Sequence, residues 1–141
     1  MHIRRARQAD ARHIAELSNQ LGYAATEEQI EERLMNLLSD EVHAVFVMEA
    51  EEEVVGWAHI QGRHLIESAA FAEIGGLVVH SRCRGQGIGR MLMRACEDWA
   101  REQKYGAVRV RSGGQRLDAH RFYEQIGYTR VKSQEVFDLH L

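Results

Sequence analysis

The chain has 141 residues, of which 45% are hydrophobic and 28% charged, with a formal net charge of −3 and a pI near 6.2. This length suits one domain with its own hydrophobic core, and the composition is that of an ordinary soluble globular protein. The small negative charge excludes a global attraction to nucleic acid or to an anionic membrane, so any basic patch has to be local. The two cysteines predict no disulfide framework, the scattered histidines predict no metal site, and the lack of an apolar signal segment favours a cytoplasmic location.

The first part of the chain predicts a strand and two helices. Residues 3–6 can form a strand, and Asp10 is then placed to cap a helix. Thr26 and Gln29 have the spacing of a capping box for a second helix. The apolar stripes expected to be buried are Ile14, Leu17 and Leu21 in the first helix and Ile30, Leu34, Leu37 and Leu38 in the second.

The middle of the chain predicts a hairpin and a further strand. Residues 42–48 and 54–60 are rich in Val and aromatic residues, and the acidic run 49–53 between them suits a solvated turn. Residues 71–79 predict another buried strand, in which Gly75 and Gly76 indicate either a bulge or the close approach of a ligand.

The last part predicts two helices and three short strands. A helix is expected from Ile88 to a stop at Gly106, followed by a strand over 107–111. Residues 116–126 predict a helix that Gly127 ends, and two short strands are expected at 128–131 and 135–141. The whole predicts an α/β (α+β) chain: one domain over 1–141, with a mixed β-sheet flanked by about four helices.

The stretch "RCRGQGIGR" at 82–90 joins the strand 71–79 to the start of a helix. It sets glycines at alternate positions and surrounds them with arginines. Unpaired N–H groups and the dipole at a helix start bind anions, glycines admit close approach, and arginines add charge-assisted contacts. This pattern favours a pyrophosphate site, although a tight turn with no ligand explains the glycines alone. The dinucleotide-binding fingerprint and the P-loop are both excluded, because Arg90 replaces the third glycine of the former and the sequence lacks the latter.

Two motifs together resemble those of the GNAT superfamily of acetyl-CoA-dependent N-acetyltransferases. The first is [QR]-x-x-G-x-[GA], here Arg84 to Gly89, and the second is "AHRFYEQIGY" at 119–128. The resemblance implies a splayed sheet and acetyl-CoA as co-substrate. It also implies that the backbone of Leu77, Val78 and Val79 pairs with pantetheine. The pyrophosphate would be held by Arg84, Gly85, Gln86, Gly87, Ile88, Gly89 and Arg90.

Acetyl transfer to an amine requires a neutral nucleophile, donors for the oxyanion and a proton for the departing thiolate. The N–H near Val79 is a candidate oxyanion donor. The resemblance favours Tyr123 as the acid, although spacing alone favours a packing residue. Glu73, a carboxylate in an apolar strand, is the candidate base, with His59 a weaker second choice. His80 can simply cap the strand end, and His120 is more simply a solvated helix residue.

The predicted function is direct transfer of an acetyl group to a primary amine in a ternary complex. The acceptor is expected to be a small molecule or a peptide, and a homodimer is left open. Acidic residues could form a rim for a cationic acceptor, but a solvated helix face explains them as well; they are Glu27, Glu28, Glu31 and Glu32. The alternative function is a non-catalytic acetyl-CoA-binding sensor or regulatory module.

Overall fold

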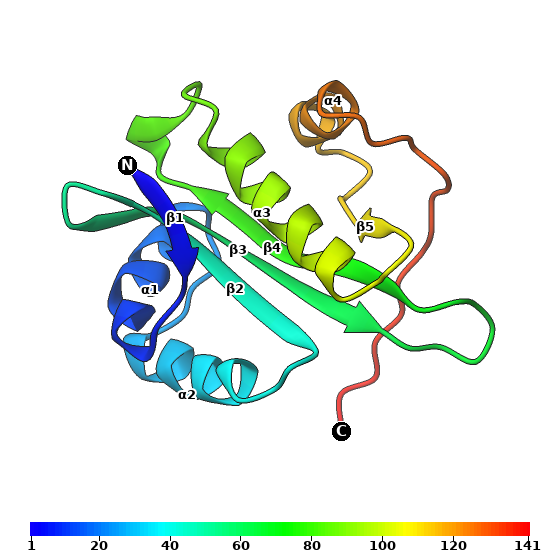
Figure 1. Ribbon diagram of the computed structural model, residues 1–141, viewed down its shortest axis with the longest axis horizontal. Coiled ribbons are helices and arrows are strands. Elements are labelled where there is room, and N and C mark those ends of the chain that lie inside the picture. The colour runs from blue at the N-terminus through cyan, green and yellow to red at the C-terminus, as the bar shows by residue number, and fades with distance from the viewer. The chain divides into compact units, whose positions relative to one another are not determined.

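A five-stranded sheet in the order β1-β2-β3-β4-β5 forms the centre of residues 1–110. Neighbouring strands pair antiparallel, except that β5 runs parallel to β4, which confirms the predicted mixed sheet. The strands are β1 (His2–Arg5), β2 (His43–Ala50), β3 (Glu53–Arg63), β4 (Phe71–Val79) and β5 (Val108–Val110) (Figure 1). The computed structural model describes all 141 residues as two units, Met1–Val110 and Arg111–Leu141.

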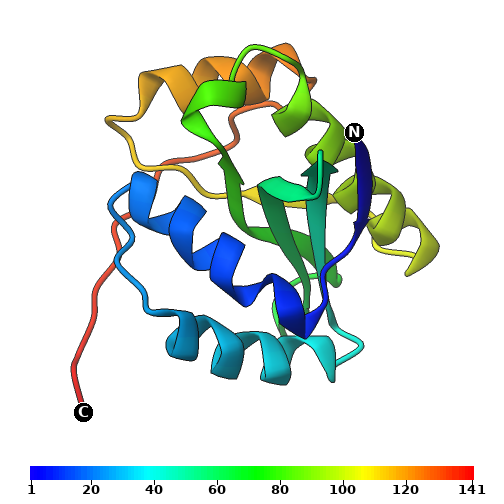
Figure 2. The same ribbon diagram turned by 90° about the vertical axis from the view of Figure 1, so that its left-hand side faces the viewer.

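Helices cover both faces of this sheet. Figure 2 shows α1 (Ala11–Gln20) and α2 (Glu27–Leu38) on one side of the strands and α3 (Ile88–Glu102) on the other. The core under α1 and α2 includes Ile14, Leu17, Ile30, Leu34, Val45, Val47 and Val78. Most of the predicted apolar stripe is therefore buried, but Leu38 is not, because it lies in the last turn of α2 and is 37% exposed. None of the helices is both long and apolar enough to span a membrane.

Local sequence signals explain several element ends. The Thr26 hydroxyl accepts from the N–H of Gln29 at 3.1 Å, and the Gln29 side chain accepts from the N–H of Thr26 at 3.0 Å, so the predicted capping box is confirmed. Asp10 does precede α1, but its carboxylate accepts from the N–H of Arg7 and from Arg4 instead of capping α1.

Two further predictions need correction at turns. The turn between β2 and β3 consists of Glu51 and Glu52 alone, both with positive φ. The turn is therefore shorter than the predicted run 49–53, whose outer residues belong to the strands. Helix α3 ends at Glu102, and Lys104 takes a left-handed conformation with φ 66°. Gly106 therefore lies beyond the helix end that it was expected to cause.

A β-bulge interrupts the pairing of β3 with β4. His59 pairs with Gly76, but the next residue, Ile60, pairs with Ile74, so Gly75 is the extra residue. An added Cβ at Gly75 would lie 2.4 Å from the His59 ring, and one at Gly76 would lie 2.6 Å from the Trp57 ring. Both glycines are thus required by neighbouring side chains, and the predicted bulge is confirmed.

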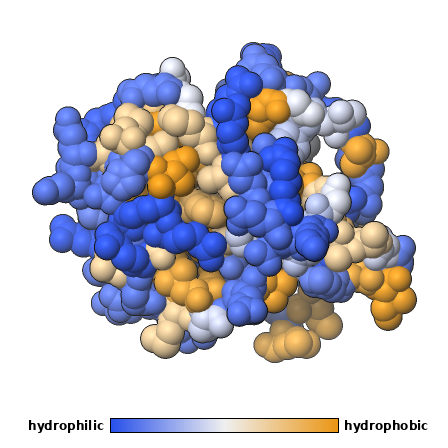
Figure 3. Space-filling view, in the orientation of Figure 1, coloured by the Kyte–Doolittle hydropathy of each residue, from blue (hydrophilic) through white to orange (hydrophobic).

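Residues 111–141 contain one helix, α4 (Leu117–Gln125). Gly127 follows it with φ 103°, and the N–H of Tyr128 donates to the carbonyl of Tyr123 at 2.9 Å, as predicted for a glycine that ends a helix. The strands predicted at 128–131 and 135–141 are absent, because no strand pairs with either segment. The apolar side chains of these segments are exposed; they are Val131, Val136, Phe137, Leu139 and Leu141. Figure 3 shows hydrophobic residues scattered over a mainly hydrophilic face of the molecule.

Candidate active site

The glycine-rich loop connects β4 to α3 through a short 3₁₀ turn at Ser81–Cys83. Nδ1 of His80 accepts from the N–H of Arg82 at 3.0 Å, so His80 caps this turn. Gly85 and Gly87 both adopt left-handed conformations, with φ 80° and 79°, and nothing lies within 4 Å of an added Cβ at either position. The glycines are therefore required by backbone conformation and leave open space beside the loop.

The first turn of helix α3 follows the loop and lies beside this open space. Gly87 is the N-cap of α3, and the first helical bond runs from the N–H of Met91 to the carbonyl of Gly87 at 3.0 Å. The N–H groups of Ile88, Gly89 and Arg90 thus have no acceptor within the helix. Arg84 and Arg90 are exposed beside them. N–H groups, the helix dipole and two guanidinium groups together suit a phosphate ligand.

One edge of β4 lacks a neighbouring strand just before this loop. β5 pairs with β4 only over Ala72–Ile74, so no strand pairs with that edge from Gly75 to Val79. The N–H of His80 donates to the carbonyl of Val55 in β3 at 2.8 Å. Because peptide groups alternate in direction along a strand, the N–H and C=O groups of Leu77 and Val79 point away from β3, toward the open edge. An extended ligand with amide groups could therefore pair there.

The bulge decides which face of the sheet Glu73 occupies. Residues paired across antiparallel strands share a face. Glu73 pairs with Gln61, and Val78 with Trp57, so Glu73 lies on the α1–α2 face, opposite to Leu77 and Val79. Without the bulge, alternation would have placed Glu73 on the face of Leu77.

Glu73 is buried and ion-paired. It is 6% exposed, and its Oε2 accepts from Nη1 of Arg63 at 2.7 Å. The predicted base is thus a carboxylate whose negative charge is balanced by a guanidinium group.

The same face carries a pair of histidines. Nδ1 of His43 lies 2.9 Å from Nε2 of His59, and their rings stack with centroids 5.1 Å apart. Burial, together with the neighbouring His43, lowers the pKa of His59 to about 4, so His59 is neutral at neutral pH. Nε1 of Trp57, also on this face, is buried without a hydrogen-bond partner.

Tyr123 and His120 both lie on α4, in the unit 111–141. Burial raises the pKa of Tyr123, which keeps the phenol protonated at neutral pH, and its ring contacts those of Phe122 and Tyr128 edge-on. A protonated phenol can donate a proton.

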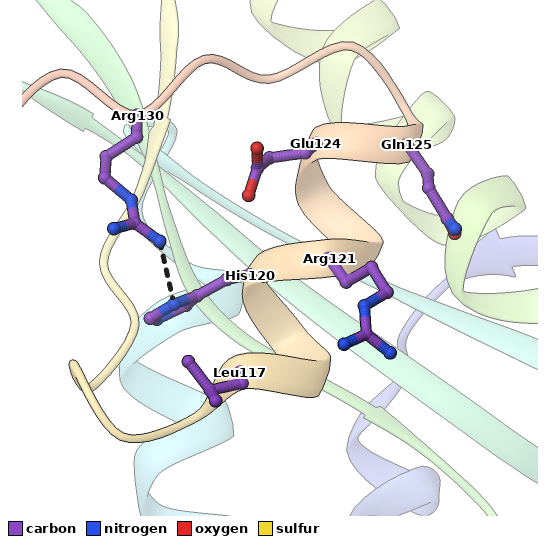
Figure 4. Close-up of a pocket in the computed structure, with 6 residues that line it drawn as sticks. All are labelled: Leu117, His120, Arg121, Glu124, Gln125 and Arg130. Carbon is purple, nitrogen blue, oxygen red and sulfur yellow. Dashed lines mark hydrogen bonds between the residues drawn. The ribbon is translucent and has the colours of Figure 1, made fainter.

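His120 has structural partners in the same unit. Its Nε2 donates to the carbonyl of Gly113 at 2.8 Å, and its Nδ1 accepts from Nη2 of Arg130 at 3.2 Å, the bond dashed in Figure 4. His120 and Arg130 help to line a shallow pocket of about 450 Å³ on α4, with the other residues drawn in Figure 4. These bonds account for His120 without a catalytic role.

The two cysteines are free thiols, as predicted. Cys96 is buried in α3, and burial raises its pKa to about 12. A thiol that stays protonated and buried is a poor nucleophile.

Comparison with known proteins identifies this arrangement of strand, loop and helix. The model of the Acetyltransferase (GNAT) family matches residues 8–128. The chain belongs to this family. The match includes β4, the glycine-rich loop, α3 and α4, and it confirms the resemblance seen in the two sequence motifs.

Curated GNAT relatives include enzymes with small-molecule acceptors in their names. The chain is 29% identical to an aminoglycoside N(6′)-acetyltransferase of Stenotrophomonas maltophilia, over 99% of this chain and 93% of that protein. It is 34% identical to the aminoalkylphosphonate N-acetyltransferase of Salmonella typhimurium, over 79% of this chain and 71% of that protein. A shorter match, 47% identical over 57 residues, covers 40% of this chain and 40% of an uncharacterized N-acetyltransferase of Bacillus subtilis.

Solved structures support the fold assignment. An aminoglycoside 6′-N-acetyltransferase of Acinetobacter haemolyticus matches all of this chain and 99% of its own, with TM-score 0.87 and 18% identity. An aminoglycoside N-acetyltransferase solved in complex with CoA matches 99% of this chain and 95% of its own, with TM-score 0.90 and 16% identity. The GNAT fold predicted from the sequence is thereby confirmed, and acetyl-CoA is confirmed as co-substrate at the level of the family.

The structure brings some of the predicted residues together. The strand β4 ends with Leu77, Val78 and Val79, and the short turn at Ser81–Cys83 links it to the loop from Arg84 to Arg90. Glu73 and Tyr123 belong to different units, and their joint action stays a prediction. His43 was not predicted, because it is 16 residues from its partner His59 and no local pattern in the sequence links the two.

Proposed function

We propose that this GNAT protein transfers the acetyl group of acetyl-CoA to a primary amine of a small molecule, by direct attack in a ternary complex. The observation that carries this proposal is the open edge of β4 from Gly75 to Val79, which continues into the glycine-rich loop and the start of α3. A cytoplasmic location and a single domain over residues 1–141 stay predictions.

Acetyl-CoA would bind along this edge. The amide groups of pantetheine would pair with the backbone of Leu77 and Val79 as an added strand does, and Val78 would lie between them in the same segment. The pyrophosphate would take the N–H groups of the loop and of the first turn of α3, from Arg84 to Arg90. The N–H of Val79, which points to the open edge, would hold the thioester oxyanion.

Direct attack is favoured over a covalent acetyl-enzyme. Cys96 is buried, with a pKa of about 12, and Cys83 lies in the short turn before the loop, in neither of the two sequence motifs. The amine would therefore attack the thioester itself. Tyr123, whose raised pKa keeps it protonated, is the proposed donor to the departing thiolate.

The amine has to be neutral when it attacks. A lysine-type amine has a pKa of about 10.4 and is mostly protonated at neutral pH. Glu73 stays a proposed catalytic residue for this step, although accepting a proton would cost it the ion pair with Arg63. In Glu73→Gln, a loss of kcat/KM that recovers as the pH rises would support Glu73 as base. A loss that does not depend on pH would instead assign it to acceptor binding or structure.

Relatives suggest the acceptor class. The two longest curated matches act, by their names, on aminoglycosides and aminoalkylphosphonates, which are small molecules with primary amines. The exposed positions of the four acidic residues of α2 fit a solvated face better than an acceptor rim; they are Glu27, Glu28, Glu31 and Glu32.

Thiol release from acetyl-CoA tests the proposal. The assay would offer the protein an aminoglycoside, an aminoalkylphosphonate, a polyamine, an amino acid and a lysine peptide. We expect saturable release of CoA thiol with at least one small-molecule amine, and mass spectrometry should show the acetylated product. Tight acetyl-CoA binding without release for any amine would support the sensor instead.

A further inference from the structure

Three polar side chains connect solvent with the bulge of β4. Oδ2 of Asp40 lies 3.8 Å from Nε2 of His43, and Nδ1 of His43 lies 2.9 Å from Nε2 of His59. Nδ1 of His59 faces the bulge, because a Cβ added to Gly75 would lie 2.4 Å from it. Asp40 and Gly75 are both exposed, whereas the two histidines between them are largely covered.

The order of these groups favours one tautomer for each ring. The carboxylate of Asp40 favours a proton on Nε2 of His43, which leaves Nδ1 of that ring as an acceptor. His59 must then donate its Nε2 proton to His43, and its own Nδ1 carries a lone pair. This nitrogen lies beside the backbone of Gly75, which is exposed and has no side chain to cover it.

Charges around His59 favour passage of a proton over its retention. The charged or titratable groups on this face of the sheet include His43 and Asp40 on the β2 side, Arg63 in β3 and Glu73 in β4. Arg109 of β5 pairs in register with Glu73 on the same face, and Glu73 is ion-paired with Arg63. Farther along the face, Arg4 is ion-paired with Asp10. The contacts made here by α1 and α2 come mainly from apolar core residues. The pKa of about 4 keeps His59 neutral, so a proton received on one nitrogen would leave from the other.

We propose that Nδ1 of His59 accepts the proton of the acceptor amine, directly or through one water, and that His43 and Asp40 carry the charge out to solvent. This inference rests on the proposed function. The N–H bond of the ammonium group breaks as an N–H bond forms at Nδ1 of His59. The Nε2 proton of His59 passes to Nδ1 of His43, and the Nε2 proton of His43 passes to the Asp40 carboxylate or to water. In this relay His59 takes the place of Glu73 as the catalytic base, Glu73 keeps its ion pair with Arg63, and His43 and Asp40 are positioning residues.

Kinetics of three variants test the relay. His59→Gln should lower kcat/KM by about 10²-fold at neutral pH. The loss should shrink at alkaline pH, where the amine loses its proton in solution, and the affinity for acetyl-CoA should not change. His43→Gln should show the same pH-dependent loss, and Asp40→Asn a smaller one. His2→Gln, which removes a histidine that is 64% exposed, is the matched control and should behave as wild type.

An NMR measurement of the ring nitrogens gives a readout that does not depend on activity. In the wild-type protein His59 should carry its proton on Nε2, and Asp40→Asn should increase the other tautomer. If the enzyme acetylates amines but the His59 ring carries its proton on Nδ1, the relay is wrong and the proposed function still stands. A His59→Gln loss that is equal at all pH values would also overturn it, especially if Glu73→Gln recovers at high pH. If the wild type released no thiol with any amine, the proposed function would fail and the relay with it.

Discussion

Replacing Gly87 with aspartate places one negative charge at the N-cap of α3, where we propose that the pyrophosphate of acetyl-CoA binds. Gly87 has φ 79°, and nothing lies within 4 Å of an added Cβ, so a side chain there costs strain but meets no steric clash. A left-handed conformation costs an ordinary residue about 1–2 kcal/mol, and Asn and Asp tolerate it best. Gly87→Asn therefore makes a control that shares the strain and the shape without the charge.

The expected effect follows from the distance between charges. A carboxylate about 4 Å from a phosphate oxygen is repelled by about 4 kcal/mol at an effective dielectric constant of about 20. That energy corresponds to about 10³-fold in affinity. Because Gly87 is exposed and water screens the charge, we expect Gly87→Asp to bind acetyl-CoA about 10²-fold more weakly than Gly87→Asn.

Isothermal titration calorimetry with acetyl-CoA measures this ratio directly. Circular dichroism would first establish that both variants are folded. The ratio should fall as salt is added, because the repulsion is screened. Equal affinities for Gly87→Asp and Gly87→Asn at low salt would mean that the start of α3 does not bind the pyrophosphate.

Three further predictions concern other parts of the chain. Tyr123→Phe should lower kcat by about 10² to 10⁴ without changing acetyl-CoA affinity, and an unchanged kcat would leave this phenol only a packing role. Gly76→Ala should lower the free energy of unfolding by about 1–3 kcal/mol, because its Cβ would lie 2.6 Å from the indole ring of Trp57. Gly106→Ala, which has open space around the added Cβ, is the control and should leave the melting temperature in thermal melts unchanged. Iodoacetamide should label Cys83 and spare the buried Cys96, as peptide mass spectrometry can check; rapid labelling of Cys96 in the folded protein would contradict its burial and raised pKa.

Local chemistry made part of the fold predictable. The capping box of Thr26 and Gln29 and the helix stop at Gly127 depend on residues that are close in sequence, and both appear as expected. The strand 71–79 has the bounds predicted, because its apolar run leads straight into the glycine-rich loop. The loop itself was recognisable because glycines and arginines have a direct chemical meaning beside a helix start.

What depends on strand register was not predictable. The face that Glu73 occupies follows from the bulge at Gly75, and the contact of His43 with His59 follows from how β2 aligns with β3. A single displaced residue reverses every side chain beyond it, so neither could be derived from the pattern of residue types. At 135–141 the pattern of apolar residues predicted a strand that does not form, since these residues pair with no neighbouring strand.

The most direct test of the central claim is the release of CoA thiol by the wild-type protein in the presence of small-molecule primary amines, with Gly87→Asp measured in parallel. We predict saturable, amine-dependent release of thiol by the wild type, with one acetylated amine formed per thiol. At the same acetyl-CoA concentration, Gly87→Asp should release thiol more slowly than the wild type, because it binds acetyl-CoA more weakly. Acetyl-CoA binding by the wild type without thiol release for any amine, or equal release by Gly87→Asp, would contradict the account.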